Sequence, residues 1–354
     1  MSTFAADRVS IFGVGACTAV GLSAPSTAAA VRAGIAAMAA HPFMIDKMGA
    51  PMIVCASPLA PLHIRGADRF AALASAAYGE ALAPLCARHA TAELTLLLAL
   101  PEQRPGMPDR LQRRLGDVFA SGMPGHLRIR DVVIHPAGHA GGLLCLEQAL
   151  MIIRREPERL CLLGGVDSYL DPDSLEWLDA TDQLHSETTI WGSCPGEGAA
   201  FCILASPDRG GHLGLQACVD VAAVASDLER ATHGSAAVCT GQGLSSAFRK
   251  ALDSLEPDVQ IDQTICDMTG EAYRADEFGF AVLRTAKRFT PEADFITPAD
   301  CWGNVGAASA PLFMILAAAA AQRRYAAGPH TLLFASSDAG QRGAAVLRAP
   351  PRAQ

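Results

Sequence analysis

The stretch from Ile129 to Arg155 constrains the fold most, because a strand, a glycine-rich turn and a helix follow one another there without interruption. The apolar run that ends at Ile134 leads into a turn, and a helix over Gly141–Arg155 begins close to His139. The free N–H groups and the dipole at a helix N-terminus favour a thiolate or an oxyanion. The layout is therefore typical of a nucleophile site, yet the residue at its tip is a histidine.

Short β-rich runs alternate with alanine-rich helical stretches along the whole chain, which favours an α/β fold. Half of the 354 residues are hydrophobic, enough for a large core. The pattern predicts strands over Val9–Gly13, Met52–Ala56, Leu94–Leu100, Arg128–Ile134, Leu160–Gly165, Gly198–Leu204, Leu213–Val224, Gln260–Cys266, Phe295–Thr297, Thr331–Ser336 and Ala344–Arg348. It predicts helices over Pro25–Ala37, Ala67–Arg88, Pro108–Ala120, Gly141–Arg155, Ser174–Leu178, Gln242–Leu255, Glu271–Ala286 and Val305–Arg324.

A turn-rich segment over Ser206–Gly211 divides this succession and is predicted to be a linker. Strands and helices succeed one another in a comparable way on its two sides. The sequence therefore predicts an N-terminal half over residues 1–206 and a C-terminal half over residues 207–354, within one compact unit.

Five blocks of this chain, in the same order, resemble the β-ketoacyl-ACP synthases, the condensing enzymes of the thiolase superfamily. They are Val9–Gly21, Gly164–Ser168, Pro195–Ala200, Gly303–Ser309 and Ser336–Leu347. The resemblance implies an α/β thiolase-like five-layered α/β/α/β/α fold made of two similar halves. It also implies a role in fatty-acid or polyketide-type metabolism and no cofactor, but a fold alone does not establish an activity.

Condensing enzymes carry the acyl chain on a cysteine thiolate and stabilise the enolate with two histidines, or with one histidine and one asparagine. The resemblance places His139 at the nucleophile position, Met268 at the first histidine position and Asn304 at the second. An acyl-imidazole hydrolyses readily, and methionine cannot donate a hydrogen bond to an enolate oxygen. The resemblance also aligns Asp276 with an acidic residue of the family and Ala339 with the aromatic gatekeeper, while Ala299 stands near the place of a frequent lysine.

Other residues near these blocks could carry altered chemistry. The cysteines Cys194, Cys266 and Cys301 each lie close to a block, and any of them could be a displaced nucleophile paired with His139. Free cysteines are nevertheless more often small buried hydrophobes. The carboxylate of Glu197 reads as a structural hydrogen-bond acceptor in its Gly-Glu-Gly turn. The predicted site therefore has His139 and Asn304 as its chemical groups, lined by Met268, Ala339, Cys194 and Cys301.

Composition excludes several classes of function. The net charge of −8, without a basic run, argues against nucleic-acid binding. The longest apolar run, Leu312–Ala321, is too short to span a bilayer, and the N-terminus lacks the apolar region of a signal peptide. The 11 cysteines show no metal-binding spacing, so we expect reduced thiols, a cytoplasmic location and no metal.

Three functions follow from this pattern. The first is a non-catalytic, chain-length-factor-like partner of an active ketosynthase, since His139 and Met268 depart together from the condensing machinery. The second is an acyltransferase or thioester hydrolase with altered chemistry that uses His139 and Asn304. The third is a homodimeric scaffold that holds an acyl chain. The expected partners are an acyl carrier protein or an acyl-CoA thioester, and a second subunit in a homodimer or a heterodimer with an active ketosynthase.

Overall fold

The computed structural model describes residues 8–233, 235 and 237–350; the N-terminal residues assessed for a signal peptide begin outside this part. The first half contains β1 (Val9–Thr18), α1 (Ala24–Arg32), β2 (Ala39–Ile45), β3 (Pro51–Val54), α2 (Gly66–Ala87), β4 (Ala92–Ala99), α3 (Leu111–Gly122), β5 (Leu127–His135), η1 (Gly138–Ala140), α4 (Gly141–Arg155), β6 (Leu160–Ser168), α5 (Pro172–Ala180) and β7 (Glu197–Ala205). The second contains α6 (Pro207–His212), β8 (Val219–Leu228), α7 (Gln242–Asp253), β9 (Ile261–Cys266), α8 (Ala272–Thr285), η2 (Ala286–Arg288), β10 (Phe289–Ile296), α9 (Ala299–Trp302), η3 (Gly306–Ala308), α10 (Ser309–Gln322), β11 (His330–Ser336) and β12 (Gln341–Arg348).

The strand order shows that the two halves have the same topology. Ten strands are hydrogen-bonded in the order β10-β9-β11-β12-β8-β1-β7-β6-β4-β5. Reading outward from the central pair gives β8-β12-β11-β9-β10 in the second half and β1-β7-β6-β4-β5 in the first, and each strand has its counterpart at the same place in the other half. In each half the outer three strands run parallel, and the inner two pair antiparallel. The halves meet where β1 pairs antiparallel with β8. The predicted fold of two similar halves is confirmed, while the boundary between residues 206 and 207 stays a prediction.

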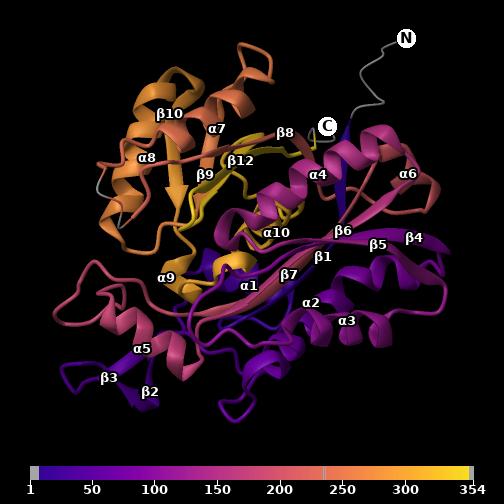
Figure 1. Cartoon of the computed structure of the whole chain (residues 1–354). Helices are drawn as coiled ribbons and strands as arrows, with labels where there is room; N and C mark the ends of the chain where they lie inside the picture. The colour runs from indigo at the N-terminus through magenta and orange to yellow at the C-terminus, as the bar shows by residue number, and fades with distance from the viewer. Residues whose placement is uncertain (1–7, 234, 236, 351–354) are drawn as a thin grey trace.

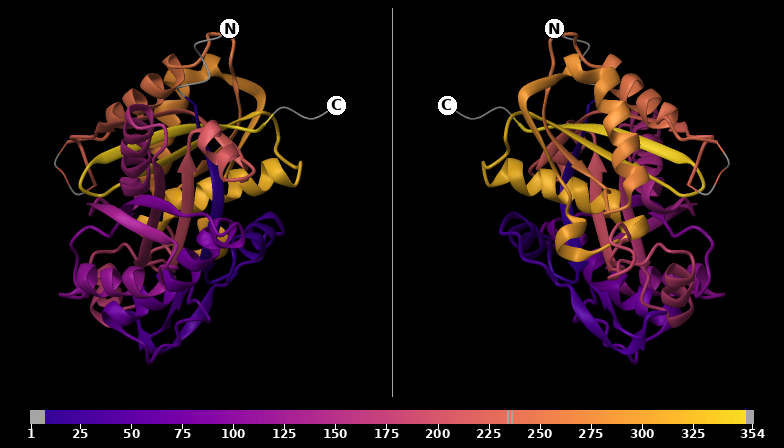
Figure 2. Two further views of the ribbon diagram at one scale, coloured as in Figure 1. Left: turned by 90° about the vertical axis from the view of Figure 1, so that its right-hand side faces the viewer. Right: turned by 90° about the vertical axis from the view of Figure 1, so that its left-hand side faces the viewer.

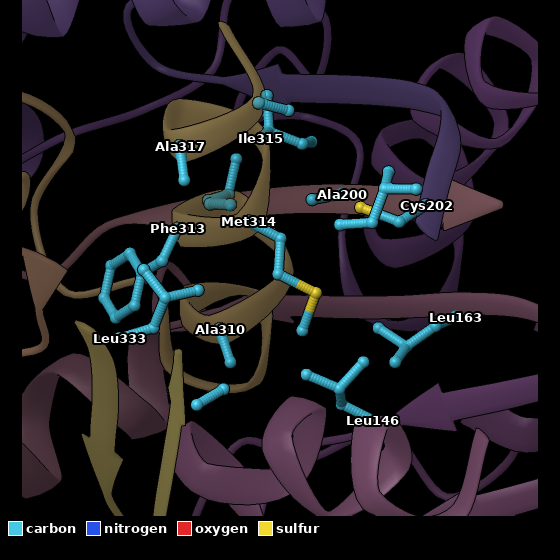
Figure 3. Packing of buried hydrophobic residues seen from close by; sticks show 14 of the residues in the cluster. Leu146, Leu163, Ala200, Cys202, Ala310, Phe313, Met314, Ile315, Ala317 and Leu333 are labelled. Carbon is cyan, nitrogen blue, oxygen red and sulfur yellow. The ribbon is translucent and has the colours of Figure 1, made fainter. Parts of the chain in front are cut away.

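Three hydrophobic clusters fill the spaces between the layers. The helices α2 and α3 pack against one half-sheet, α7 and α8 pack against the other, and α4 and α10 pack between the two. In Figures 1 and 2 most of the indigo-to-magenta first half lies below and most of the orange-to-yellow second half above, while the magenta α4 lies in the upper part. In the central cluster, Met314 points toward Leu146 and Leu163, and Phe313 lies beside Leu333 (Figure 3).

The apolar runs of the sequence are continuous because both faces of each half-sheet are buried. In β4, Leu96 and Leu98 point into the outer cluster beneath α2, while Leu97 and Ala99 point into the central cluster. Alternation along a strand thus divides one run between two cores. This burial on both faces positions the ends of β4 and β6 against the starts of the two central helices.

The structure corrects several predicted boundaries. The segment over Ser206–Gly211 is not an irregular turn: Pro207–His212 forms the short helix α6, because Ser206 caps it and Pro207 suits a first helical turn. The strand predicted over Leu213–Val224 begins only at Val219, and β2 was not predicted at all. The first helix ends at Arg32 rather than Ala37, because Gly34 leaves the helix with a φ of +66°.

The helix α2 is long and apolar enough to cross a membrane by length and composition. Its side chains Leu73, Tyr78 and Leu82 are buried against the half-sheet and α3, which is how core helices of globular proteins pack. The predicted absence of a membrane span was based on Leu312–Ala321 alone and overlooked this helix. The absence of a membrane span therefore stays a prediction.

Candidate functional site

The centre of the candidate site is a buried pair of side chains from the two halves. Nε2 of His139 lies 2.7 Å from Oδ1 of Asn304, and the residues are 2% and 6% exposed. The backbone N–H of Gly306 donates to the same Oδ1 at 3.0 Å, which identifies that atom as the acceptor oxygen. His139 therefore donates from Nε2, and in the neutral ring Nδ1 keeps the free electron pair.

Both side chains stand at equivalent places in the repeated topology. His139 lies in η1 before α4, and Asn304 lies just before η3 and α10. Each turn contains a glycine with positive φ, +54° at Gly138 and +46° at Gly306. A Cβ at Gly306 would lie 1.9 Å from the Asp167 carboxylate, so only glycine fits this approach. The duplicated fold thus brings together two turns that are 165 residues apart.

The hairpin between β11 and β12 closes over the His139 turn. The Oγ of Ser337 accepts the N–H of Ala140 at 2.8 Å and donates to the carbonyl oxygen of Ala137. The N–H of Ala339, two residues further, donates to the carboxylate of Glu102 at 3.1 Å. Burial raises the pKa of Glu102, while the hydrogen bond from the Ala339 N–H acts on the same carboxyl in the opposite direction. Ser337 and Glu102 were both missed from the sequence.

A positional signal could have pointed to Glu102. It follows β4 by three residues, and side chains beyond the carboxyl ends of parallel strands commonly line sites in α/β sheets. Ser337 follows β11 in the same way. Neither residue belongs to a spacing pattern that indicates chemistry, so their contacts emerge only in the tertiary structure.

The other carboxylates around the site are held in buried ion pairs. Glu197 accepts two hydrogen bonds from Arg69, one from the Ser57 N–H at 2.8 Å and one from the Ser168 hydroxyl at 2.8 Å. Its predicted structural role agrees with these contacts. Asp167 pairs with Arg104 in the same manner.

A third ion pair holds the acid beside Met268. Asp267 pairs with Arg274 at 3.1 Å and accepts the N–H of Ser336. Asp276, aligned with a family acid, is exposed, and the buried acid of α8 is its neighbour Glu277. Neighbouring residues point about 100° apart on a helix, so Asp276 faces solvent while Glu277 faces the core, and the alignment of Asp276 with the family acid stays a prediction.

The cysteines near the blocks lie apart from the histidine. The Sγ of Cys194 lies 3.8 Å from the Sγ of Cys55, while the Cys194 carbonyl accepts the Asn304 N–H at 2.7 Å. The Cys266 thiol donates to the Ile296 carbonyl, and burial raises its pKa to about 12. Cys301 is buried at the end of α9, and its carbonyl accepts the N–H of Ala37. Within the described residues no thiol is hydrogen-bonded to His139, and a pairing of one of these cysteines with His139 stays a prediction.

The two remaining predicted lining residues occupy different surroundings. Met268 is partly buried and packs against the cluster beneath α7 and α8. Ala339 is exposed at the hairpin. Among the described residues no hydrogen bond joins either side chain to His139 or Asn304, and a lining role for them stays a prediction.

Comparison with known proteins identifies the fold. No protein-family model and no curated protein matches the chain. The ishigamide ketosynthase/chain length factor superposes with a TM-score of 0.78 at 17% identity, over 97% of this chain and 99% of that one. A chain from the complex of a type II polyketide synthase acyl carrier protein with its ketosynthase superposes with a TM-score of 0.78 at 14% identity, over 97% of this chain and 99% of that one. The module 6 ketosynthase of the bacillaene synthase from Bacillus subtilis 168 superposes with a TM-score of 0.79 at 11% identity, over 98% of this chain and 72% of that one.

These matches define the class of fold to which the chain belongs. Its architecture is the thiolase-like fold of ketosynthases, as its sequence blocks implied. At these levels of identity the likeness concerns the fold alone, and activity depends on the residues of the site.

Proposed function

We propose that this chain is a ketosynthase-like protein of fatty-acid or polyketide-type metabolism that lacks condensing activity and serves as a chain-length-factor-like partner of an active ketosynthase. One observation carries the proposal: the residue at the nucleophile turn is His139, buried and bonded to Asn304, with no described thiol bonded to it. A condensing reaction needs a thiolate that can hold an acyl group through a second bond-forming step. An imidazole would lose that acyl group to water.

The edge strand β5 supports a second subunit. It ends the described sheet, and its outer N–H and C=O groups are unpaired by any described strand. Val132 at its middle is 55% exposed, beside a groove of about 450 Å³ lined by Leu115, Phe119 and Ile134. An unpaired edge strand with an exposed valine among charged side chains suits strand pairing with another chain, either a second copy or an active ketosynthase.

Acyl loading tests the loss of condensing activity. The chain is incubated with radiolabelled acyl-ACP or acyl-CoA, with and without a cysteine-bearing ketosynthase from the same source. We expect no stable label on this chain alone and label on the ketosynthase in the mixture. A stable stoichiometric acyl adduct on this chain would contradict the proposal.

Co-purification tests the partner. Val132→Asp is expected to abolish association, because it places a charge on the pairing edge, while Leu283→Asp on α8, an even more exposed apolar residue, leaves association intact. A complex that survives Val132→Asp would locate the partner elsewhere.

The second function, acyl transfer or thioester hydrolysis, is supported by the free Nδ1 electron pair that the His139–Asn304 bond leaves. This function is tested by measuring the turnover of a panel of acyl thioesters by the wild type and by His139→Ala. Equal rates for the two proteins would contradict a catalytic role of His139. The third function, a homodimeric acyl-chain scaffold, predicts a lipid-like ligand beside Met268 and Ala339. Mass spectrometry of the native protein would reveal such a ligand without any turnover.

A further inference from the structure

Three potential metal ligands converge in the second half, behind the β11–β12 hairpin. Glu229 follows β8, Cys239 precedes α7, and Glu277 lies on α8. Each offers one ligand atom, and the three atoms all lie within 4.8 Å of one another. Both glutamates are buried and the cysteine is half-buried.

Glu277 has an unused oxygen inside this cluster. The residue is 1% exposed, and its Oε1 accepts the Nε of Arg342 at 2.6 Å. Its Oε2 has no hydrogen-bond partner in the described part of the chain. Burying a carboxylate oxygen without a partner costs free energy, so such a group recruits a proton or a cation.

The charges of the cluster do not cancel. Arg342 compensates one of the two carboxylates, and it is itself held by the Ser337 carbonyl. If Cys239 ionises, the cluster carries two uncompensated negative charges. A divalent cation neutralises both, whereas a single proton on Glu277 does not allow the thiolate to form.

We infer that Glu229, Cys239 and Glu277 form a binding site for a divalent transition-metal cation of the zinc class. Carboxylate oxygens and a thiolate together are ligands that zinc accepts, while calcium and magnesium take oxygen ligands only. Zinc bonds of about 2.0–2.3 Å require ligand atoms about 3.5 Å apart, so the three side chains need to move inward by about 1 Å. Three protein ligands leave a fourth position for water.

The hydrogen bonds that Glu229 already makes are compatible with a bound cation. Its two oxygens accept the N–H groups of Ala231 at 3.1 Å and Gly243 at 2.8 Å. Each carboxylate oxygen has two acceptor positions, so one can take the N–H while the other binds the cation. These bonds orient the Glu229 carboxylate toward the start of α7, as outer contacts do for many metal ligands.

The spacing of the sequence gave no indication of this site. Its ligands come from three elements that lie 10 and 38 positions apart along the chain, without the short repeats by which cysteine- and histidine-based zinc sites are recognised. The Glu229 N–H also donates to the Gly340 carbonyl at 2.7 Å, so the cluster and the hairpin over His139 share a backbone contact. We therefore expect a bound cation to stabilise that hairpin, independently of the function proposed above.

Cobalt binding to the full chain tests the site. After treatment with a chelator, Co²⁺ is titrated in while its absorption is followed, and the bound metal is counted after dialysis. We expect one Co²⁺ per chain, a near-ultraviolet band from thiolate-to-cobalt charge transfer, and displacement by Zn²⁺. Co²⁺ at about 100 times its Kd should also raise the folded-to-unfolded ratio about 100-fold.

Matched variants locate the ligands. Cys239→Ser should abolish the charge-transfer band, while Cys86→Ser, a half-buried cysteine in the first half, retains it. Glu229→Gln keeps an oxygen for the Gly243 N–H, so it should fold normally but bind Co²⁺ at least about tenfold more weakly. Absence of stoichiometric binding, or a band that survives Cys239→Ser, would overturn the inference. Either result would leave the ketosynthase-partner proposal untouched.

Discussion

Removal of the Glu197 carboxylate should destabilise the protein strongly, because Glu197 is the hub of a fully buried network. It is 0% exposed and accepts hydrogen bonds from Arg69, Ser57 and Ser168. In Glu197→Ala the Arg69 guanidinium stays buried, with only the carbonyls of Pro61 and Ile64 as partners. Breaking a buried ion pair on one side costs about 3–5 kcal/mol, since the remaining charge is uncompensated.

Guanidinium unfolding, followed by circular dichroism, measures this loss as a lower transition midpoint. The control is Glu93→Ala, which removes an exposed pair with Arg128 at 4.0 Å and should cost less than about 1 kcal/mol. The double variant Arg69→Met/Glu197→Gln removes the charge and keeps an acceptor for the Ser57 N–H. It should be more stable than Glu197→Ala if uncompensated charge is the cause. A loss below about 1 kcal/mol in Glu197→Ala would refute this reasoning and reopen a chemical role for the carboxylate.

Three further results follow from the site. Ser337→Ala should cost about 1–3 kcal/mol in the same unfolding assay, since it leaves the Ala140 N–H and the Ala137 carbonyl unpaired, while the exposed Ser121→Ala changes little. Burial raises the pKa of Glu102 above 4.5, so the contribution of the protonated carboxyl to stability is complete below about pH 4.5 and is lost as the pH rises through the folded-state pKa. Glu102→Gln should flatten this decline of the unfolding midpoint with pH. A pH profile that Glu102→Gln leaves unchanged would count against the prediction. Iodoacetamide at about pH 8 should label the half-buried Cys86 before Cys266, whose pKa is raised to about 12, as read by peptide mass spectrometry; early labelling of Cys266 would contradict the burial of its thiol.

The fold was largely predictable because its core elements have strong local patterns. The strands β4 and β6 are rich in apolar residues since both of their faces are buried, and α4 was predicted with the bounds that the structure has. The pattern failed where elements are short or exposed. The strand β2 carries Pro42 and mostly exposed side chains, and α6 contains Gly210 and Gly211, so neither has the apolar periodicity of a buried element.

The candidate site was predictable only in part. Sequence blocks pointed to His139 and Asn304, and the structure places them 2.7 Å apart, although their chemical roles stay predictions. Contacts made by Glu102 and Ser337 were invisible, because each is an ordinary polar residue after a strand. The suspected cysteines could not be judged either, since the direction of a thiol depends on how separate loops pack.

By itself the sequence determined most of the buried strands and helices, because these depend on alternation and turn residues within a few positions of one another. It also determined that the tip of the nucleophile turn is an imidazole rather than a thiol. Only the tertiary structure decided that this imidazole donates to Asn304 and is shielded from solvent, with Glu102 on the neighbouring hairpin N–H. The reason is physical: these partners lie in distant loops, and burial of the two half-sheets around α4 and α10 brings the loops together.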